Sequence, residues 1–109
     1  MSRSSNQADF FITVSTEEIS KEKQKAQTLR KSQWWKNKRA CNRCYYCQNN
    51  FPAKNLTMDH IVPLARGGKS TKSNIVACCK NCNSQKKYFL PLEWEEYLES
   101  LRSKKKTES

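Results

Sequence analysis

Six cysteines constrain this chain more than any other feature of its sequence. Four of them form two CxxC pairs, Cys44–Cys47 and Cys79–Cys82, which are separated by 31 residues. Each pair can present two thiolates to one ion at about 2.3 Å, and two pairs complete the closed tetrahedral set of a structural zinc site. The spacing therefore predicts a zinc ion that joins two distant segments. Disulfide bonds are the alternative.

The two remaining cysteines leave a second choice of ligands open. Cys41 and Cys44 also form a CxxC pair, so Cys41 competes with Cys47. We favour Cys44 and Cys47, with Cys41 as a spare thiol or a core residue. Cys78 lies four residues from Cys82, which is the poorer spacing. In a domain of only 109 residues, zinc binding would supply roughly 10 kcal/mol or more of stability.

The start of the sequence indicates a compartment where such cysteines stay reduced. Between Met1 and Glu18 there is no basic region followed by an apolar stretch, as an export signal would require. No run approaches the 18 or more apolar residues of a membrane span. We therefore expect a cytoplasmic protein without a membrane partner, in which zinc is favoured over disulfides.

The formal net charge of +11 is unevenly distributed. Between Lys23 and Leu92, fifteen Lys and Arg residues accompany a single carboxylate, that of Asp59. A surface this positive attracts a polyanion and gains affinity by releasing counterions from nucleic acid. The predicted partner is therefore nucleic acid. The alternative is a solvated face kept soluble by its charge, which usually mixes both signs.

The chain divides into four parts by composition. Residues 1–15 are polar and predict a flexible tail. Residues 16–39 contain no Gly or Pro and predict a basic helical arm, with Ser15 or Thr16 followed by Glu18 or Glu22 as its start. Residues 40–89 hold all six cysteines. Residues 90–109 predict an amphipathic helix from about Pro91, packed on the domain and ending in a basic tail.

The cysteine-rich part predicts a hairpin followed by a helix. Leu56–Met58 with Ile61–Val62 predicts one strand, Asn74–Cys78 predicts a second, and Arg66–Ser73 joins them. A helix follows Cys82. Two short strands are too small to be stable alone, so the metal must complete the unit. The expected fold class is a small α+β, zinc-stabilised domain with flanking N- and C-terminal helices.

Asp59 and His60 are neighbours, and each is unusual. Asp59 is the single carboxylate of the basic region, and His60 is the only histidine of the chain. An ionised carboxylate suits a hard divalent cation, whereas an imidazole with a reference pKa near 6.5 suits a general base. Adjacent strand residues point to opposite sides. We therefore assign Asp59 to a metal ion and His60 to the attacking water, although a lone histidine is more often structural.

These residues stand within a wider pattern. It comprises Phe51-Pro52, Leu56 to Pro63, Arg66-Gly67-Gly68, Asn74-Ile75-Val76, Cys79 to Asn83, and Lys86. Together they resemble the HNH endonuclease family, in its McrA-like, four-cysteine branch, over about residues 41–87. The resemblance implies a ββα-metal, treble-clef-like domain. It also implies metal-dependent hydrolysis of phosphodiester bonds in DNA, with double-stranded DNA as the expected partner.

The resemblance assigns further roles by position. His60 would be the general base, Asp59 would bind the catalytic ion, and Asn74 would brace the loop that holds His60. Asn83 would be the second ligand of the catalytic ion, expected to be Mg²⁺ or Mn²⁺. Asn83 replaces the final histidine of the family name, and a neutral amide shifts preference toward harder ions. Lys87 stands where relatives often have Gly, which predicts that the helix continues.

The same resemblance points to a set of basic side chains as phosphate contacts. They are Arg66, Lys69, Lys72, Lys86 and Lys87. The aromatic residues Trp34, Trp35, Tyr45 and Tyr46 would stack on bases or, more simply, pack around the zinc core. The competing hypothesis is a non-catalytic, zinc-stabilised module that only binds nucleic acid. A protein-interaction zinc finger fits poorly with so many positive charges.

Overall fold

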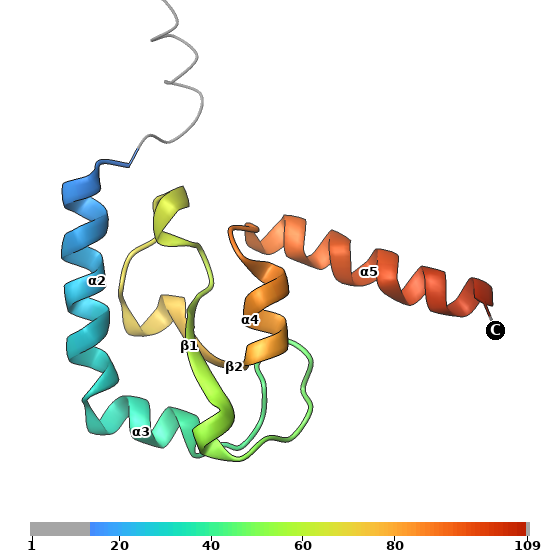
Figure 1. Ribbon diagram of the computed structural model, residues 1–109, viewed down its shortest axis with the longest axis horizontal. Helices are drawn as coiled ribbons and strands as arrows, with labels where there is room; N and C mark the ends of the chain where they lie inside the picture. The colour runs from blue at the N-terminus through green and yellow to red at the C-terminus, as the bar shows by residue number, and fades with distance from the viewer. Residues whose placement is uncertain (1–13, 109) are drawn as a thin grey trace, which may run out of the picture.

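The computed structural model describes the backbone of residues 14–108 and the side chains of residues 14–103 (Figure 1). Except for Val14 and Ser15, the predicted tail lies outside the described residues. The helices and strands in chain order are α2 (Thr16–Arg30), α3 (Gln33–Arg39), β1 (Leu56–His60), β2 (Ile75–Cys79), α4 (Lys80–Lys86) and α5 (Pro91–Glu108). Short 3-10 turns lie at Ala53–Asn55, Leu64–Arg66 and Lys72–Asn74.

The predicted start of the N-terminal helix is confirmed. Ser15 caps α2 by accepting a hydrogen bond from the backbone N–H of Glu18, at 3.1 Å. The Glu18 carboxylate in turn accepts one from the N–H of Ser15, at 3.0 Å. This reciprocal pair satisfies N–H groups that have no partner within the helix, so it fixes where the helix begins.

The prediction of one helix through residue 39 was wrong. α2 ends at Arg30, and α3 begins at Gln33 with Ser32 as its cap. The Ser32 hydroxyl donates to the carbonyl of Leu29 at 2.6 Å and accepts from the N–H of Trp35 at 3.3 Å. A serine that bonds to nearby backbone in this way competes with the helical pattern. The resulting bend brings Trp35 into the core.

The two predicted strands form an antiparallel hairpin, in which Leu56 pairs with Cys79 and His60 pairs with Ile75. Every residue of β2 is buried. Ile61 and Val62, expected in the first strand, lie beyond its end, where the N–H of Ile61 donates to the carbonyl of Asn74 at 2.8 Å. β1 therefore ends at His60, at the mouth of the connecting loop.

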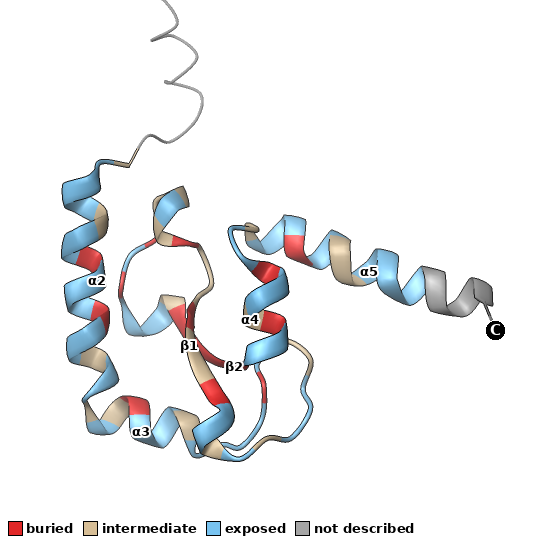
Figure 2. Ribbon diagram, in the orientation of Figure 1, coloured by how far each residue is buried: buried red, intermediate tan, exposed pale blue. Residues whose placement is uncertain are grey.

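The side chains of β1 alternate between two neighbouring helices. Thr57 contacts Asn83 of α4, whereas Met58 accepts a weak hydrogen bond from Arg30 at the end of α2. In Figure 1, β1 lies between α2 on one side and α4 on the other. Figure 2 shows buried positions along the hairpin and on the parts of α2 and α4 that lie nearest to it. The hairpin is thus the centre of the domain.

α4 begins earlier than predicted, before Cys82 rather than after it. It begins at Lys80, and Cys79 is its N-cap. The expectation that the helix continues through Lys87 was wrong, because the helix ends at Lys86 and Lys87 has φ 45°. This positive φ is unfavourable for a residue with a side chain and is adopted easily by glycine. Lys87 thus takes the helix-ending conformation without being a glycine.

The predicted C-terminal helix begins at Pro91 and packs through its first turns. Trp94 is buried, and its ring lies 5.6 Å from Tyr46, 6.1 Å from Phe89 and 5.5 Å from Tyr97 between centroids. Leu101, about two turns further along the helix, is 41% exposed. The N-terminal part of α5 therefore closes the aromatic side of the core, and the helix then leaves the domain (Figure 1).

Candidate active site and zinc centre

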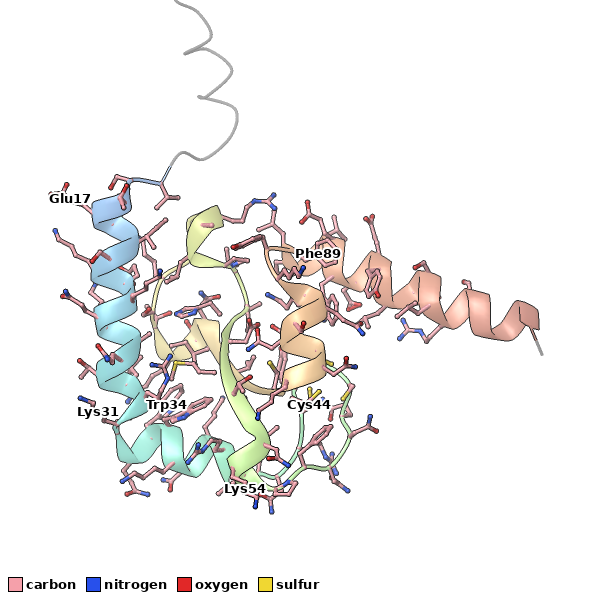
Figure 3. The ribbon with its side chains drawn as sticks, viewed as in Figure 1. Glu17, Lys31, Trp34, Cys44, Lys54 and Phe89 are labelled. Carbon is pink, nitrogen blue, oxygen red and sulfur yellow. The ribbon has the colours of Figure 1, made fainter. Side chains whose placement is uncertain are left out.

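Four cysteines converge at the base of the hairpin, as the spacing predicted. The Sγ atoms of Cys44, Cys47, Cys79 and Cys82 all lie within 4.8 Å of one another. The sulfur atoms of Cys47 and Cys79 are 4.0 Å apart, close to the edge of about 3.8 Å for a tetrahedron with Zn–S bonds of 2.3 Å. The donor set and its burial fit a structural zinc ion (Figure 3).

Backbone N–H groups point at two of these sulfurs. Cys44 Sγ accepts from the N–H groups of Tyr46 at 3.4 Å and Cys47 at 3.5 Å, and Cys79 Sγ accepts from that of Cys82 at 3.4 Å. Burial alone would raise the pKa of the Cys44 thiol, but backbone hydrogen bonds lower it to about 7. These hydrogen bonds therefore favour the thiolate of Cys44, which is the form that binds zinc.

The choice between the two overlapping CxxC pairs is resolved by position. Cys47 belongs to the four-sulfur cluster, while Cys41 is exposed and its thiol donates to the carbonyl of Arg43 at 3.3 Å. Cys78 is fully buried within β2, and burial raises its pKa to about 12. All six cysteines are free thiols in the described part of the chain, so the disulfide alternative has no support there.

Asp59 points toward α4 and is 8% exposed. Its Oδ2 accepts a hydrogen bond from the hydroxyl of Tyr46 at 2.6 Å and forms an ion pair with Lys86 Nζ at 3.2 Å. Burial, and then the bond to Asp59, raises the pKa of Tyr46 above its usual range, so the phenol remains a donor. No described residue bonds to Oδ1 of Asp59, which leaves that oxygen available to a cation.

Lys86, predicted as a phosphate contact, lies inside the site. Its side chain is fully buried, and its ammonium also donates to the backbone carbonyl of His60 at 3.1 Å. It lies over the ring of Tyr46, 5.7 Å from the centroid. A buried charge needs such partners to offset the loss of water. In this arrangement the ammonium binds the Asp59 carboxylate and the backbone at the end of β1.

The side-chain amide of Asn83 is oriented by Thr57. The Thr57 hydroxyl donates its one proton to the carbonyl of Cys78 at 3.0 Å, so it can only accept from Asn83 Nδ2 at 2.9 Å. This pairing leaves Asn83 Oδ1 without a partner among the described residues. Asn83 and Lys86, one helical turn apart on α4, therefore face Thr57 and Asp59, two residues apart on β1.

His60 lies on the other side of the strand. It is half-buried, and its Nε2 is 2.9 Å from the hydroxyl of Ser70. Burial is the main cause that lowers the pKa of His60 below 6.5, which keeps the imidazole neutral at neutral pH. The ring lines a groove of about 520 Å³ beside α2, together with Lys23, Arg30 and Leu64. No hydrogen bond joins His60 to Asp59 or Asn83 in the described structure.

Asn74 closes the loop that follows β1. Its Oδ1 accepts from the N–H of Val62 at 2.9 Å, and its Nδ2 donates to the carbonyls of Val62 at 3.1 Å and Lys69 at 2.8 Å. Gly68 lies against the same carbonyl: a Cβ at this position would be 1.8 Å from the oxygen of Val62. The loop is therefore packed too closely to accept any side chain at position 68.

The other predicted phosphate contacts differ in whether their side chains already have partners within the protein. Arg66 donates to the carbonyl of Tyr88 at 3.2 Å and pairs with Glu93 at 3.3 Å, so it ties the loop to α5. Lys72 lies over the ring of Trp34, 5.7 Å from the centroid. Lys69 and Lys87 are exposed. Of the aromatic residues, Trp35 is buried and Tyr46 packs in the site, as the packing alternative expected.

Sequence reasoning missed the part that four residues play in supporting this site: Tyr46, Thr57, Ser70 and Glu22. Thr57 could have been found, because it lies two residues before Asp59 on the same side of a strand. Glu22 and Ser70 are 48 residues apart, and no local pattern links them.

Among the described helices, none is long and apolar enough to cross a membrane.

Comparison with known proteins places this chain in a family. A family model described as HNH endonuclease matches residues 44–98, just over half of the chain, from the first cysteine of the four-sulfur cluster into α5. The chain is also similar to the CRISPR-associated endonuclease Cas9 of Corynebacterium diphtheriae, with 46% identity over 44 residues. That similarity covers 39% of this chain and only 4% of the Cas9 protein. On the extent of the family match, the chain belongs to the HNH endonuclease family.

Proposed function

We propose that this protein is a metal-dependent endonuclease that hydrolyses phosphodiester bonds in DNA. The observation that carries the proposal is the arrangement around β1. Asp59 and Asn83 each keep one side-chain oxygen free on the side of the strand that faces α4. His60, with its neutral imidazole, is the residue directly after Asp59. The family membership and the similarity to an endonuclease support the same reaction.

In this proposal His60 is the general base. Its imidazole would take a proton from the attacking water, and because burial keeps it neutral it can accept that proton at physiological pH. A correctly placed base contributes roughly 10²- to 10⁴-fold in rate. Asn74 would hold the loop after His60 in place through its three hydrogen bonds to backbone groups.

Asp59 Oδ1 and Asn83 Oδ1 would hold the catalytic ion, for which Mg²⁺ or Mn²⁺ is the best match because both donors are hard oxygens. When bound, such an ion stabilises the negative charge that develops on the phosphate and on the leaving oxygen. Thr57 would bind the Asn83 amide through its Nδ2 and so leave Asn83 Oδ1 free for the ion. Tyr46 and Lys86 would hold the Asp59 carboxylate in one orientation.

The exposed lysines would bind the phosphates of double-stranded DNA. Lys69 and Lys87 are exposed, and Lys72 lies at the surface over Trp34. Such contacts position the duplex without reading its sequence. For the organisation of the chain we propose residues 40–89 as the nuclease unit, residues 16–39 as a basic arm and residues 90–109 as a C-terminal helix with a basic tail.

Cleavage of supercoiled plasmid by the zinc-loaded protein tests this proposal. Wild type is expected to nick or linearise the plasmid with Mg²⁺ or Mn²⁺ and to be inactive in EDTA. His60→Ala is expected to lose cutting while it still retains DNA at low salt. Gln27→Ala is the matched control, because Gln27 lines the same groove without a role in the chemistry. Equal cutting by His60→Ala and wild type would refute the role of His60.

One observation favours the non-catalytic, nucleic-acid-binding alternative. Asp59 Oδ2 is already neutralised by the buried ammonium of Lys86, so the carboxylate has a structural partner without any metal. If that is the whole function of Asp59, the wild type will retain DNA in a salt-dependent manner but cut no plasmid in Mg²⁺, Mn²⁺ or other divalent ions. Cutting in any of these ions excludes the alternative.

A further inference from the structure

Helix α2 reaches the candidate base through a single serine. Ser70 lies in the loop between the strands and is 7% exposed, as is Glu22 of α2. The N–H of Ser70 donates to the Glu22 carboxylate at 2.6 Å, and its hydroxyl donates to the Glu22 backbone carbonyl at 2.5 Å. The same hydroxyl is 2.9 Å from His60 Nε2. One buried serine therefore joins the helix to the imidazole.

The direction of the Ser70 hydroxyl proton decides which ring nitrogen of His60 is protonated. A hydroxyl has one proton, and the Glu22 carbonyl can only accept. Two oxygens 2.5 Å apart would repel each other without a proton between them, so the Ser70 proton lies on that contact. Toward His60 the Ser70 oxygen can only accept. Nε2 must then be the protonated nitrogen, and in a neutral imidazole Nδ1 carries the lone pair.

We propose that Ser70, held in place by Glu22 of α2, is a positioning residue that fixes His60 as the Nε2–H tautomer and leaves Nδ1 as the atom that accepts the proton. This inference rests on the proposed role of His60 as general base. Nδ1 makes no hydrogen bond with any described residue. The groove beside the ring is lined by Lys23 and Arg30, whose positive charges suit a phosphate backbone.

Through Ser70, the N-terminal helix helps to position the candidate base. α2 covers Thr16–Arg30 and lies outside the range that matches the family, residues 44–98. Glu22 bonds to Ser70 through both its carboxylate and its backbone carbonyl, so a shift of α2 would move the hydroxyl that meets His60. The geometry of the base thus depends on a segment that the family match does not include.

The tautomer can be measured directly, because His60 is the only histidine of the chain. In the full-length, zinc-loaded protein labelled with ¹⁵N-histidine, a two-bond ¹H–¹⁵N spectrum above the titration range reports which ring nitrogen is protonated. We expect a protonated Nε2 and an unprotonated Nδ1 in the wild type. A protonated Nδ1 overturns the inference. This readout needs no cleavage activity, so it separates a failure of the inference from a failure of the proposed function.

Variants of the serine test whether it causes this state. Ser70→Ala is expected to give a mixture of tautomers and to lower kcat by about 100-fold, the effect of misplacing a reacting group by roughly 1 Å. The KM for DNA should change little. Ser70→Thr keeps a hydroxyl and should restore the wild-type spectrum and much of the rate. Ser73→Ala removes an exposed hydroxyl of the same loop and is the matched control.

Zinc content and circular dichroism show whether each variant is folded. If Ser70→Ala is folded and keeps both the wild-type tautomer and the wild-type kcat, Ser70 does not position His60. If the wild type has the expected tautomer but cuts no DNA, the hydrogen-bond assignment holds and the proposed function fails. If Ser70→Ala does not fold, the wild-type spectrum together with that of Ser70→Thr still decides the question.

Discussion

The two faces of the β1–β2 hairpin are held by different kinds of contact. On the face toward α4, four thiols converge on one point and a buried ion pair joins Asp59 to Lys86. On the face toward α2, hydrogen bonds connect Glu22, Ser70 and His60. The first set lies within the family match and the second reaches outside it. The face that would bind cations is fixed by strong, charged contacts, and the face that carries the base is fixed by directional ones.

Removal of zinc should have the largest effect and should destroy both faces. Cys82→Ser, or exhaustive chelation, removes a contribution of roughly 10 kcal/mol or more, which exceeds what a small domain can lose. We expect loss of the folded circular dichroism spectrum and of bound zinc. Cys41→Ser is the control, because Cys41 lies outside the cluster and should keep one zinc per chain. A folded, zinc-free Cys82→Ser protein would contradict the assignment.

Disruption of the buried ion pair should weaken the α4 face alone. Lys86→Met leaves the Asp59 carboxylate buried without its counter-ion and should lower the free energy of unfolding by about 3–5 kcal/mol. Adding Asp59→Asn should recover part of this loss, because the unpaired charge is then removed. Urea unfolding of the zinc-loaded proteins measures both effects. Lys87→Met, at an exposed lysine next in the chain, should change little, and a loss as large as that of Lys86→Met would show that the pair is not responsible.

Loss of the Thr57 hydroxyl should have a moderate effect on the same face. Thr57→Val removes the bonds to Asn83 and Cys78, which together contribute about 2 kcal/mol. The Asn83 amide would be free to rotate, so we expect plasmid cutting to fall further than stability does, with the tautomer of His60 unchanged. Thr71→Val, at an exposed threonine, is the comparison. Equal cutting by the two variants would separate Asn83 from the reaction.

The capping box of α2 should give the smallest effect, confined to the other face. Ser15→Ala removes the bond to the Glu18 N–H and should cost about 1 kcal/mol. Because α2 carries Glu22, hydrogen exchange should increase in α2 and the Ser70 loop, while zinc binding and the α4 face stay unchanged. Increased exchange throughout the hairpin would show that the two faces are not independent.

The face toward α4, and His60 on the opposite face, were largely predictable from the sequence. The four-cysteine cluster follows from CxxC spacing, and the two strands follow from short apolar runs between turn residues. Asp59 and His60 stood out because one is the only carboxylate of a basic region and the other is the only histidine. Each of these signals is local or rests on rarity, so no knowledge of the folded chain was needed to read it.

The remaining features depend on contacts that only the folded chain creates. The burial of Lys86 could not be predicted, because a lysine is normally exposed and its partner Asp59 lies 27 residues earlier. The break at Ser32 was missed because serine is acceptable within a helix unless its hydroxyl bonds to nearby backbone. Glu22 and Ser70 are 48 residues apart in the sequence, and no sequence pattern indicates that they are in contact.

Gly68 shows how narrow the tolerance of this site is. The smallest possible side chain, one methyl group, would collide with the carbonyl oxygen of Val62 at 1.8 Å. That oxygen also receives the amide of Asn74, and Val62 follows His60 by two residues. A single added carbon, placed on a loop and touching neither a metal ligand nor the base, would therefore be transmitted through the main chain to the imidazole. At this position the addition of one carbon atom is therefore expected to disturb the candidate base.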